Sequence, residues 1–148
     1  MSELNISQAE ADFLFKMEKI SEDDKEWELP ISGGNIIVPL VSKDKKENFS
    51  LDIYQGRIDL SRRKYQTRTR QVIILARLDF SSPHRNPDGN DIGVPHLHLY
   101  KEGYNHKWAY PVPNDIFVDI NDNWQTLFDF MKFCNISESP NFKKGLFS

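Results

Sequence analysis

The sequence predicts an α+β fold in which helices cover one face of a curved antiparallel sheet. Three observations favour this fold class. Apolar residues recur at helical spacing near both ends of the chain, short alternating or β-branched runs fill the middle, and turn sequences separate those runs. We therefore expect an N-terminal helix, about five antiparallel strands and a C-terminal helix.

Length and composition predict a single domain over residues 1–148. A chain of 148 residues has the usual size of one domain, and its 12% of aromatic residues suffices for a packed core. We expect no signal peptide and no membrane-spanning run of ~20 apolar residues, hence a cytoplasmic protein with no membrane partner. Cys134 is the single cysteine, and its apolar helical surroundings predict a buried thiol.

The first helix is expected at residues 8–20. Ser7 and Glu10 have the spacing of a capping box, in which the two side chains satisfy backbone N–H groups at the start of a helix. The apolar residues that follow form a stripe at helical spacing: Phe13, Leu14, Met17 and Ile20.

Two strands are predicted after the acidic connector SEDDKEWELP. Gly33 and Gly34 open the run NIIVPLV, and Pro39 confines this strand to a sheet edge or a bulge, because proline lacks a backbone N–H. A charged turn separates it from FSLDIYQGRI, in which polar and apolar residues alternate. We expect these two strands to form a hairpin.

The segment RKYQTRTRQVIILARLDF is the longest predicted strand. From residue 72 onward its even-numbered residues are apolar and are expected to face the core, whereas the odd-numbered face becomes polar at Arg77 and Asp79.

The strand HLHLY is predicted to follow the loop SSPHRNPDGNDIGVP. Its leucines are expected to face the core, which places His96, His98 and Tyr100 on the opposite face. If this strand pairs antiparallel with the preceding one, the histidines lie on the same open face as Arg77 and Asp79.

The chain then turns at KEGYNH, and KWAYPVP predicts the last strand. A second helix is expected at residues 123–134, with Asp122 as its N-cap and Gln125 three residues later. Asn135 and Pro140 are expected to end this helix. Its apolar stripe consists of Trp124, Leu127, Phe128, Met131 and Cys134.

The predicted open face gathers residues that suit two chemistries. Two histidines at His-x-His spacing on a strand can hold a metal ion, with His96, His98 and Asp79 as ligands. The same imidazoles can transfer protons without a metal while an arginine binds phosphate. The candidate catalytic residues are Arg77, His84, His96, His98 and Tyr100.

Charge is distributed unevenly although the net charge is only −3. The first 28 residues are acidic, whereas residues 57–77 are basic and contain a single acid, Asp59. Arginines that contact phosphates suit a nucleic-acid backbone, and a solvated strand face is the alternative. The candidate nucleic-acid-binding residues are Arg57, Arg62, Arg63, Lys64, Arg68 and Arg70.

Three motif resemblances bear on function. HLHLYKE is similar to the first half of the cupin metal motif, but no second cupin motif follows, and His-x-His-x-Tyr resembles a histidine-triad signature with Tyr100 at its third position. Over residues 77–113 the segments PHRNPDG, PHLHLYKEGY and KWAYP resemble an uncharacterised bacterial and phage family. This resemblance implies a small protein that is encoded by mobile elements or takes part in conflict between phage and host. It does not indicate a particular reaction.

Three functions remain open on these observations. The first is a toxin-like ribonuclease that requires no cofactor. In it His96 and His98 act as base and acid, Arg77 stabilises phosphate, Tyr100 orients the substrate and His84 is an alternate acid. The second is a non-catalytic inhibitor or antitoxin-like protein with a bacterial protein or nucleoprotein partner. The third is a metal-binding, cupin-like protein. The oligomeric state is left open.

Overall fold

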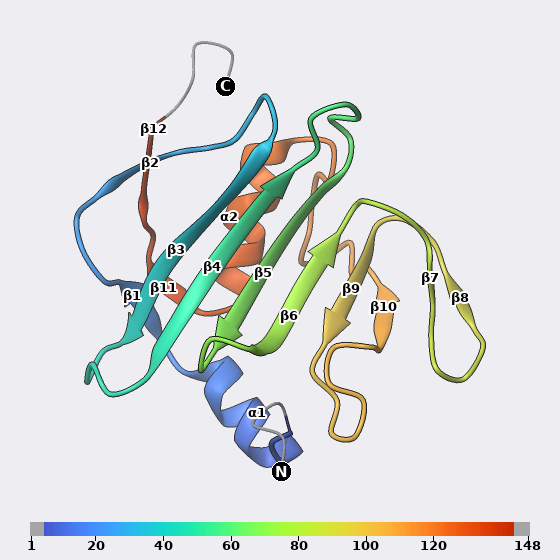
Figure 1. Cartoon of the computed structure of the whole chain (residues 1–148), viewed down its shortest axis with the longest axis horizontal. Helices are drawn as coiled ribbons and strands as arrows, with labels where there is room; N and C mark the ends of the chain where they lie inside the picture. Colours follow the sequence, from blue (N-terminus) through green and yellow to red (C-terminus); the bar gives the residue numbers. More distant parts are fainter. Residues whose placement is uncertain (1–4, 144–148) are drawn as a thin grey trace.

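The structure is a computed structural model that describes residues 5–143 (Figure 1). Its helices are α1 (Gln8–Lys16) and α2 (Asn123–Phe133). Its strands are β1 (Lys19–Ser21), β2 (Glu26–Glu28), β3 (Gly34–Ser42), β4 (Asn48–Gln55), β5 (Arg63–Thr69), β6 (Ile73–Asp79), β7 (His84–Arg85), β8 (Asp91–Ile92), β9 (His96–Leu99), β10 (Ala109–Pro111), β11 (Ile136–Glu138) and β12 (Asn141–Lys143).

The predicted α+β class is confirmed, but the sheet is larger than the five strands expected. Eight strands form it in the order β10-β9-β6-β5-β4-β3-β1-β11, and β1 pairs with β11 in parallel, so the sheet is mixed. Figure 1 shows α2 behind the sheet and α1 at one end of it. The three additional strands of this sheet are β1, from the end of the predicted first helix, β11, from the segment after α2, and one that results from the division of the long predicted strand.

The longest predicted strand is in fact a hairpin. β5 and β6 are joined by a turn in which Arg70 and Gln71 have φ angles of 51° and 69°. The register pairs Thr69 with Ile73, so the connection consists of the three residues 70–72. The turn was missed because it contains neither glycine nor asparagine.

A bulge in β6 decides which of its residues face the core. The β5–β6 register shifts by one residue, with Leu75 as the extra residue, and both Leu75 and Ala76 are buried. The prediction that even-numbered residues face the core is therefore wrong before the bulge, where Val72 is 47% exposed and Ile73 is buried. Beyond the bulge it is correct, as buried Leu78 shows.

The two helices begin as predicted and end earlier. The side chains of Ser7 and Asp122 accept hydrogen bonds from the third residue of their helices. α1 ends at Lys16 instead of residue 20, because the chain turns there and joins the sheet as β1. In α2 the buried stripe includes Phe130, whereas Phe128 is 44% exposed.

A buried lysine joins the ends of the two helices. Lys19 is fully buried, and its Nζ donates to the carbonyl oxygens of Phe15, Met17 and Cys134 at 2.7, 2.9 and 2.8 Å. These carbonyls belong to the C-terminal turns of α1 and α2, which have no intrahelical donors. Burial lowers the pKa of Lys19 to about 8, so the ammonium still carries its charge at pH 7.

Cys134 is buried, as predicted, and packs against the core face of β5. Thr67 donates a hydrogen bond to its sulfur at 3.8 Å, and burial raises the pKa of the thiol to about 12. Neither helix in the described part of the chain has the length and apolar character needed to cross a membrane.

Candidate functional site

The register of β4, β5, β6 and β9 arranges polar side chains in two rows on the sheet face opposite α2. The first row is Asp52, Gln66, Arg77 and His98. The second row is Tyr54, Lys64, Asp79 and His96. The prediction that both histidines share a face with Arg77 and Asp79 is therefore confirmed, each histidine lying directly opposite one of these residues.

All four histidines of the chain line one cavity of about 210 Å³ at the β9 end of the rows. His96 and His98 come from β9, His84 from β7, and His106 from the loop between β9 and β10. The cavity is also lined by Arg77, Asp79, Ser82, Pro83 and Lys107. Four segments within residues 77–107 thus bring imidazoles, two cations and a carboxylate together.

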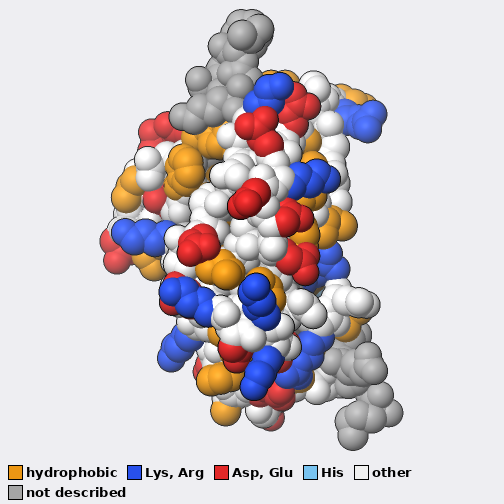
Figure 2. Space-filling view, turned by 90° about the vertical axis from the view of Figure 1, so that its left-hand side faces the viewer, with side chains coloured by type: hydrophobic (Ala, Val, Ile, Leu, Met, Phe, Trp, Pro, Cys, Tyr) orange, Lys and Arg blue, Asp and Glu red, His pale blue; other side chains and the backbone are white. Residues whose placement is uncertain are grey.

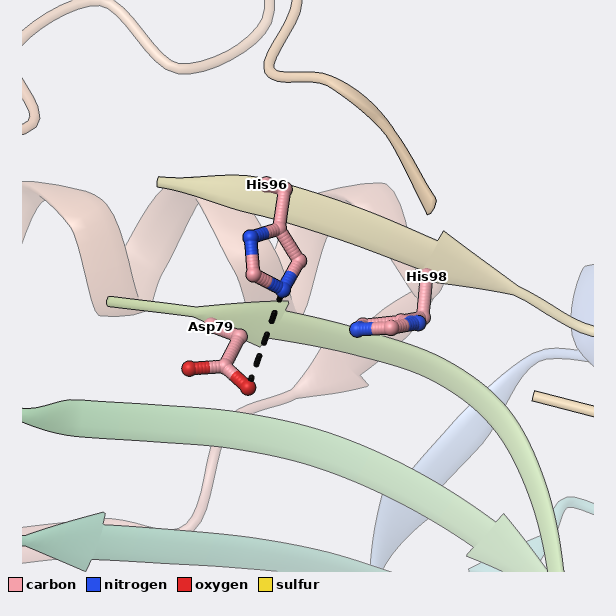
Figure 3. Close-up of side chains that lie close together, drawn as sticks. All are labelled: Asp79, His96 and His98. Atoms are coloured by element: carbon pink, nitrogen blue, oxygen red, sulfur yellow. Dashed lines mark ion pairs between the residues drawn. The ribbon is translucent and has the colours of Figure 1, made fainter. Parts of the chain in front are cut away.

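Three of the imidazole rings lie close to one another. The ring centres of His96 and His98 are 4.8 Å apart, those of His84 and His98 4.7 Å, and those of His84 and His96 5.6 Å. Figure 3 shows His96 and His98 projecting from β9 toward Asp79 on β6. His96 Nε2 is 3.8 Å from Asp79 Oδ2. Both side chains are buried, since His96 is 1% and His98 4% exposed.

Backbone groups fix one atom of each of three side chains around the cavity. His96 Nδ1 is 3.0 Å from the carbonyl oxygen of Gly93, and His84 Nε2 is 2.7 Å from that of Lys107. Because a carbonyl only accepts, each of these ring nitrogens carries a proton, and in the neutral ring the other nitrogen has a free lone pair. Asp79 Oδ1 accepts from the backbone N–H of Ser81 at 2.7 Å, which leaves Oδ2 for another contact.

Burial and crowded cations favour a neutral imidazole at His98. Desolvation is the main cause that lowers its pKa to about 4, and His96, His84 and Arg77 lower it further. Burial, followed by Arg77 and Lys107, also lowers the pKa of His106. At neutral pH the His98 ring is therefore neutral, and its lone pair is available to a metal ion, while its low pKa makes it a weak base.

Arg77 is held in place by its own row. Its Nε donates to Gln66 Oε1 at 2.8 Å, and Gln66 Nε2 in turn donates to Asp52 Oδ2 at 2.6 Å. Desolvation lowers the pKa of Arg77, but an arginine remains charged at neutral pH. The guanidinium thus presents a fixed positive charge to the cavity beside His98.

The structure does not bring Tyr100 to the cavity. Its ring is buried in the core, and its hydroxyl donates to the carbonyl oxygen of Ile6 at 2.8 Å and accepts from the Ile6 N–H at 2.9 Å. Tyr100 follows the end of β9 and pairs with the bulged Leu75, where strict strand alternation fails. It therefore fastens the segment before α1 and is not placed to orient a substrate.

The six predicted nucleic-acid-binding residues do not form one patch. Arg68 pairs with Asp52 at 2.5 Å, Arg70 pairs with Glu10 and Glu47, and Arg63 is buried over the ring of Phe80. The remaining three, Arg57, Arg62 and Lys64, lie at the end of β5 that is nearer the cavity. Figure 2 shows a different face, on which acidic and basic side chains are interspersed.

Sequence reasoning missed His106 and Lys107 as cavity residues. They follow a turn in which Gly103 and Asn105 have positive φ angles and Lys101 bridges to Asn105. The signal available was the presence of a third histidine shortly after His-x-His, but only the path of this turn brings it back to the other two.

Comparison with known proteins identifies a family. No curated protein and no solved structure matches this sequence. Residues 6–136 match a family of unknown function (DUF6978), and the match includes every residue that lines the cavity. This agrees with the expectation of an uncharacterised family. The chain belongs to the family of unknown function DUF6978.

Proposed function

We propose that the chain is a small phosphodiester-cleaving enzyme that acts on RNA in the four-histidine cavity. The observation that carries this proposal is the convergence of His84, His96, His98 and His106 with Arg77 and Lys107 around one small space. Phosphodiester cleavage needs a group that activates the nucleophile and a cation that stabilises the developing charge on phosphate. The imidazoles and Arg77 are of these two kinds.

The surroundings of the cavity suit an extended anionic substrate. Lys64 continues the second row from Asp79, and its Nζ lies 5.5 Å from the ring centre of Tyr54, which is 38% exposed. Arg57 and Arg62 lie in the exposed loop at the same end of β5. A strand of RNA with its scissile phosphate at Arg77 would meet cations and an aromatic ring along this path.

Burial of the histidines favours an enzyme over a non-catalytic inhibitor. A protein interface uses exposed side chains, whereas His96 and His98 contribute almost no surface. In this proposal the enzyme is toxin-like and acts in the phage or mobile-element conflict that the sequence resemblance implies, with RNA as its partner in the cytoplasm.

RNA cleavage by the purified full-length chain tests the proposal. A labelled single-stranded RNA is incubated with the wild type, with His98→Gln and with Arg85→Gln, each assayed with and without added Zn²⁺. Arg85 neighbours His84 on β7 but is exposed and does not line the cavity. We expect His98→Gln to reduce cleavage by at least ~100-fold and Arg85→Gln to change it less than about twofold. Absence of cleavage by the wild type under every condition would refute the proposal.

A further inference from the structure

We infer that Asp79, His96 and His98 form a binding site for a divalent transition-metal ion of the zinc class. Metal binding goes beyond the proposed reaction, because it does not depend on which substrate the cavity accepts. The inference rests on the distances between the ligand atoms, on the groups that hold them and on their chemistry.

The ligand atoms lie at metal-binding distances from one another. Asp79, His96 and His98 each offer one atom, and these atoms all lie within 4.8 Å of one another. Two atoms that are each ~2.1 Å from one ion are roughly 3.4 Å apart at the tetrahedral angle. The 3.8 Å between His96 Nε2 and Asp79 Oδ2 is too long for a hydrogen bond but only about 0.4 Å from this spacing.

The space between His96 Nε2 and Asp79 Oδ2 favours a positively charged occupant. The carbonyl oxygen of Gly93 accepts from His96 Nδ1–H, so in the neutral ring Nε2 presents a lone pair to Asp79 Oδ2. This lone pair and the carboxylate oxygen repel each other unless a metal ion or a proton lies between them. Both groups are almost fully buried, which removes the water that would otherwise weaken this repulsion.

The surrounding contacts are those of a preformed ligand set. Metal-binding histidines commonly donate their outer N–H to a backbone carbonyl, which fixes the ring and leaves the inner nitrogen free. His96 makes such a contact with Gly93. His98 Nδ1 is buried and has no hydrogen-bond partner within residues 5–143. An unpaired polar atom at this depth is unfavourable unless a ligand satisfies it.

The donor atoms favour zinc over the hard cations. Imidazole nitrogens with one carboxylate suit zinc and its neighbours in the first transition series, whereas magnesium and calcium prefer all-oxygen sites. The cavity of about 210 Å³ beside the ligands leaves room for water or substrate, as in catalytic zinc sites. If the proposed function is correct, an ion held by these residues would supply a nucleophile by lowering the pKa of a bound water.

Calorimetric titration tests the inference. The full-length chain is stripped of metal with a chelator, dialysed and titrated with ZnCl₂, with MgCl₂ in a parallel titration. Two ligand variants are used: Asp79→Asn, which keeps an oxygen acceptor for the Ser81 N–H, and His96→Gln. The control is His106→Gln, which lines the same cavity outside the ligand set. Circular dichroism and urea unfolding without metal establish that each variant is folded.

We expect about one Zn²⁺ per wild-type chain, a higher unfolding midpoint with zinc, and no such effects with magnesium. The two ligand variants should bind at least ~100-fold more weakly, while His106→Gln stays within about threefold of the wild type. Failure of the wild type to bind zinc, or unchanged binding by folded Asp79→Asn and His96→Gln, would overturn the inference. Zinc binding without RNA cleavage would leave the metal site standing and refute only the proposed reaction, whereas RNA cleavage by a wild-type chain that binds no zinc in the titration would refute only the metal site.

Discussion

Gln66 accepts a hydrogen bond from Arg77 Nε at 2.8 Å, and this bond joins the cation of the cavity to the centre of the sheet. Replacing Gln66 with methionine should release the guanidinium without changing the size of the side chain. We expect kcat/KM for RNA cleavage to fall about tenfold, the effect of losing one hydrogen bond to a charged group. Steady-state kinetics measures this.

The matched control for this change is Ser50→Ala. The Ser50 hydroxyl bonds to the same Asp52, at 3.1 Å, but lies farther from the cavity. Its removal should leave cleavage within about twofold of the wild type. If Gln66→Met and Ser50→Ala lost equal amounts of cleavage activity, the hydrogen bonds of this row would contribute to stability and would not position Arg77.

Tyr100→Phe should affect stability and leave cleavage unchanged. The variant loses both hydrogen bonds to Ile6, which should lower the free energy of unfolding by about 1–3 kcal/mol. Urea unfolding measures this, with Tyr104→Phe, at a 39% exposed position, as a control expected to change by less than about 0.5 kcal/mol. A Tyr100→Phe protein of normal stability that cleaves RNA poorly would restore Tyr100 to the catalytic set.

Lys19→Met should be strongly destabilising, because it leaves three buried carbonyl groups at two helix ends without donors. We expect the free energy of unfolding to fall by about 3 kcal/mol or more in urea unfolding. Lys16→Met, at an exposed position in the last turn of α1, should change it by less than about 0.5 kcal/mol. Similar values for the two variants would contradict the role assigned to Lys19.

The thiol of Cys134 should be unreactive in the folded protein even in mild alkali. Because burial raises its pKa to about 12, only roughly one molecule in a thousand carries a thiolate at pH 9, compared with most molecules of an ordinary cysteine. Reaction with an alkylating reagent at pH 7 and pH 9 should therefore be slow, and rapid in urea. Fast alkylation of the folded protein at pH 9 would show that the thiol is accessible.

Local patterns predicted the parts of the fold that depend on near neighbours. The capping residues Ser7 and Asp122 marked both helix starts, and the β3–β4 hairpin forms as predicted. The β5–β6 turn could not be found in this way, since Arg70 and Gln71 rarely adopt positive φ angles and do so here because the flanking strands pair. Strand β1 was also missed, because Ile20 continued the apolar stripe of the predicted first helix, and three residues carry too little pattern to indicate a strand.

The candidate site was predictable only in part, for the same reason. The alternation of β6 and β9 is local, so the shared face of Arg77, Asp79, His96 and His98 followed from the sequence once antiparallel pairing was assumed. His106 lines the cavity because of the turn that precedes it, and Tyr100 lies in the core because it pairs with the bulge in β6. Neither position can be predicted from the alternation of polar and apolar residues. Burial of the site depends in turn on the path of segments outside the sheet.

The most direct test of the account is anomalous diffraction at the zinc absorption edge from a crystal of the full-length chain grown with zinc. We predict one strong anomalous peak between His96 Nε2, Asp79 Oδ2 and His98, about 2.0–2.3 Å from each ligand atom. A crystal grown with saturating zinc in which zinc occupies only surface positions, and none lies between these three residues, would contradict the proposed metal site.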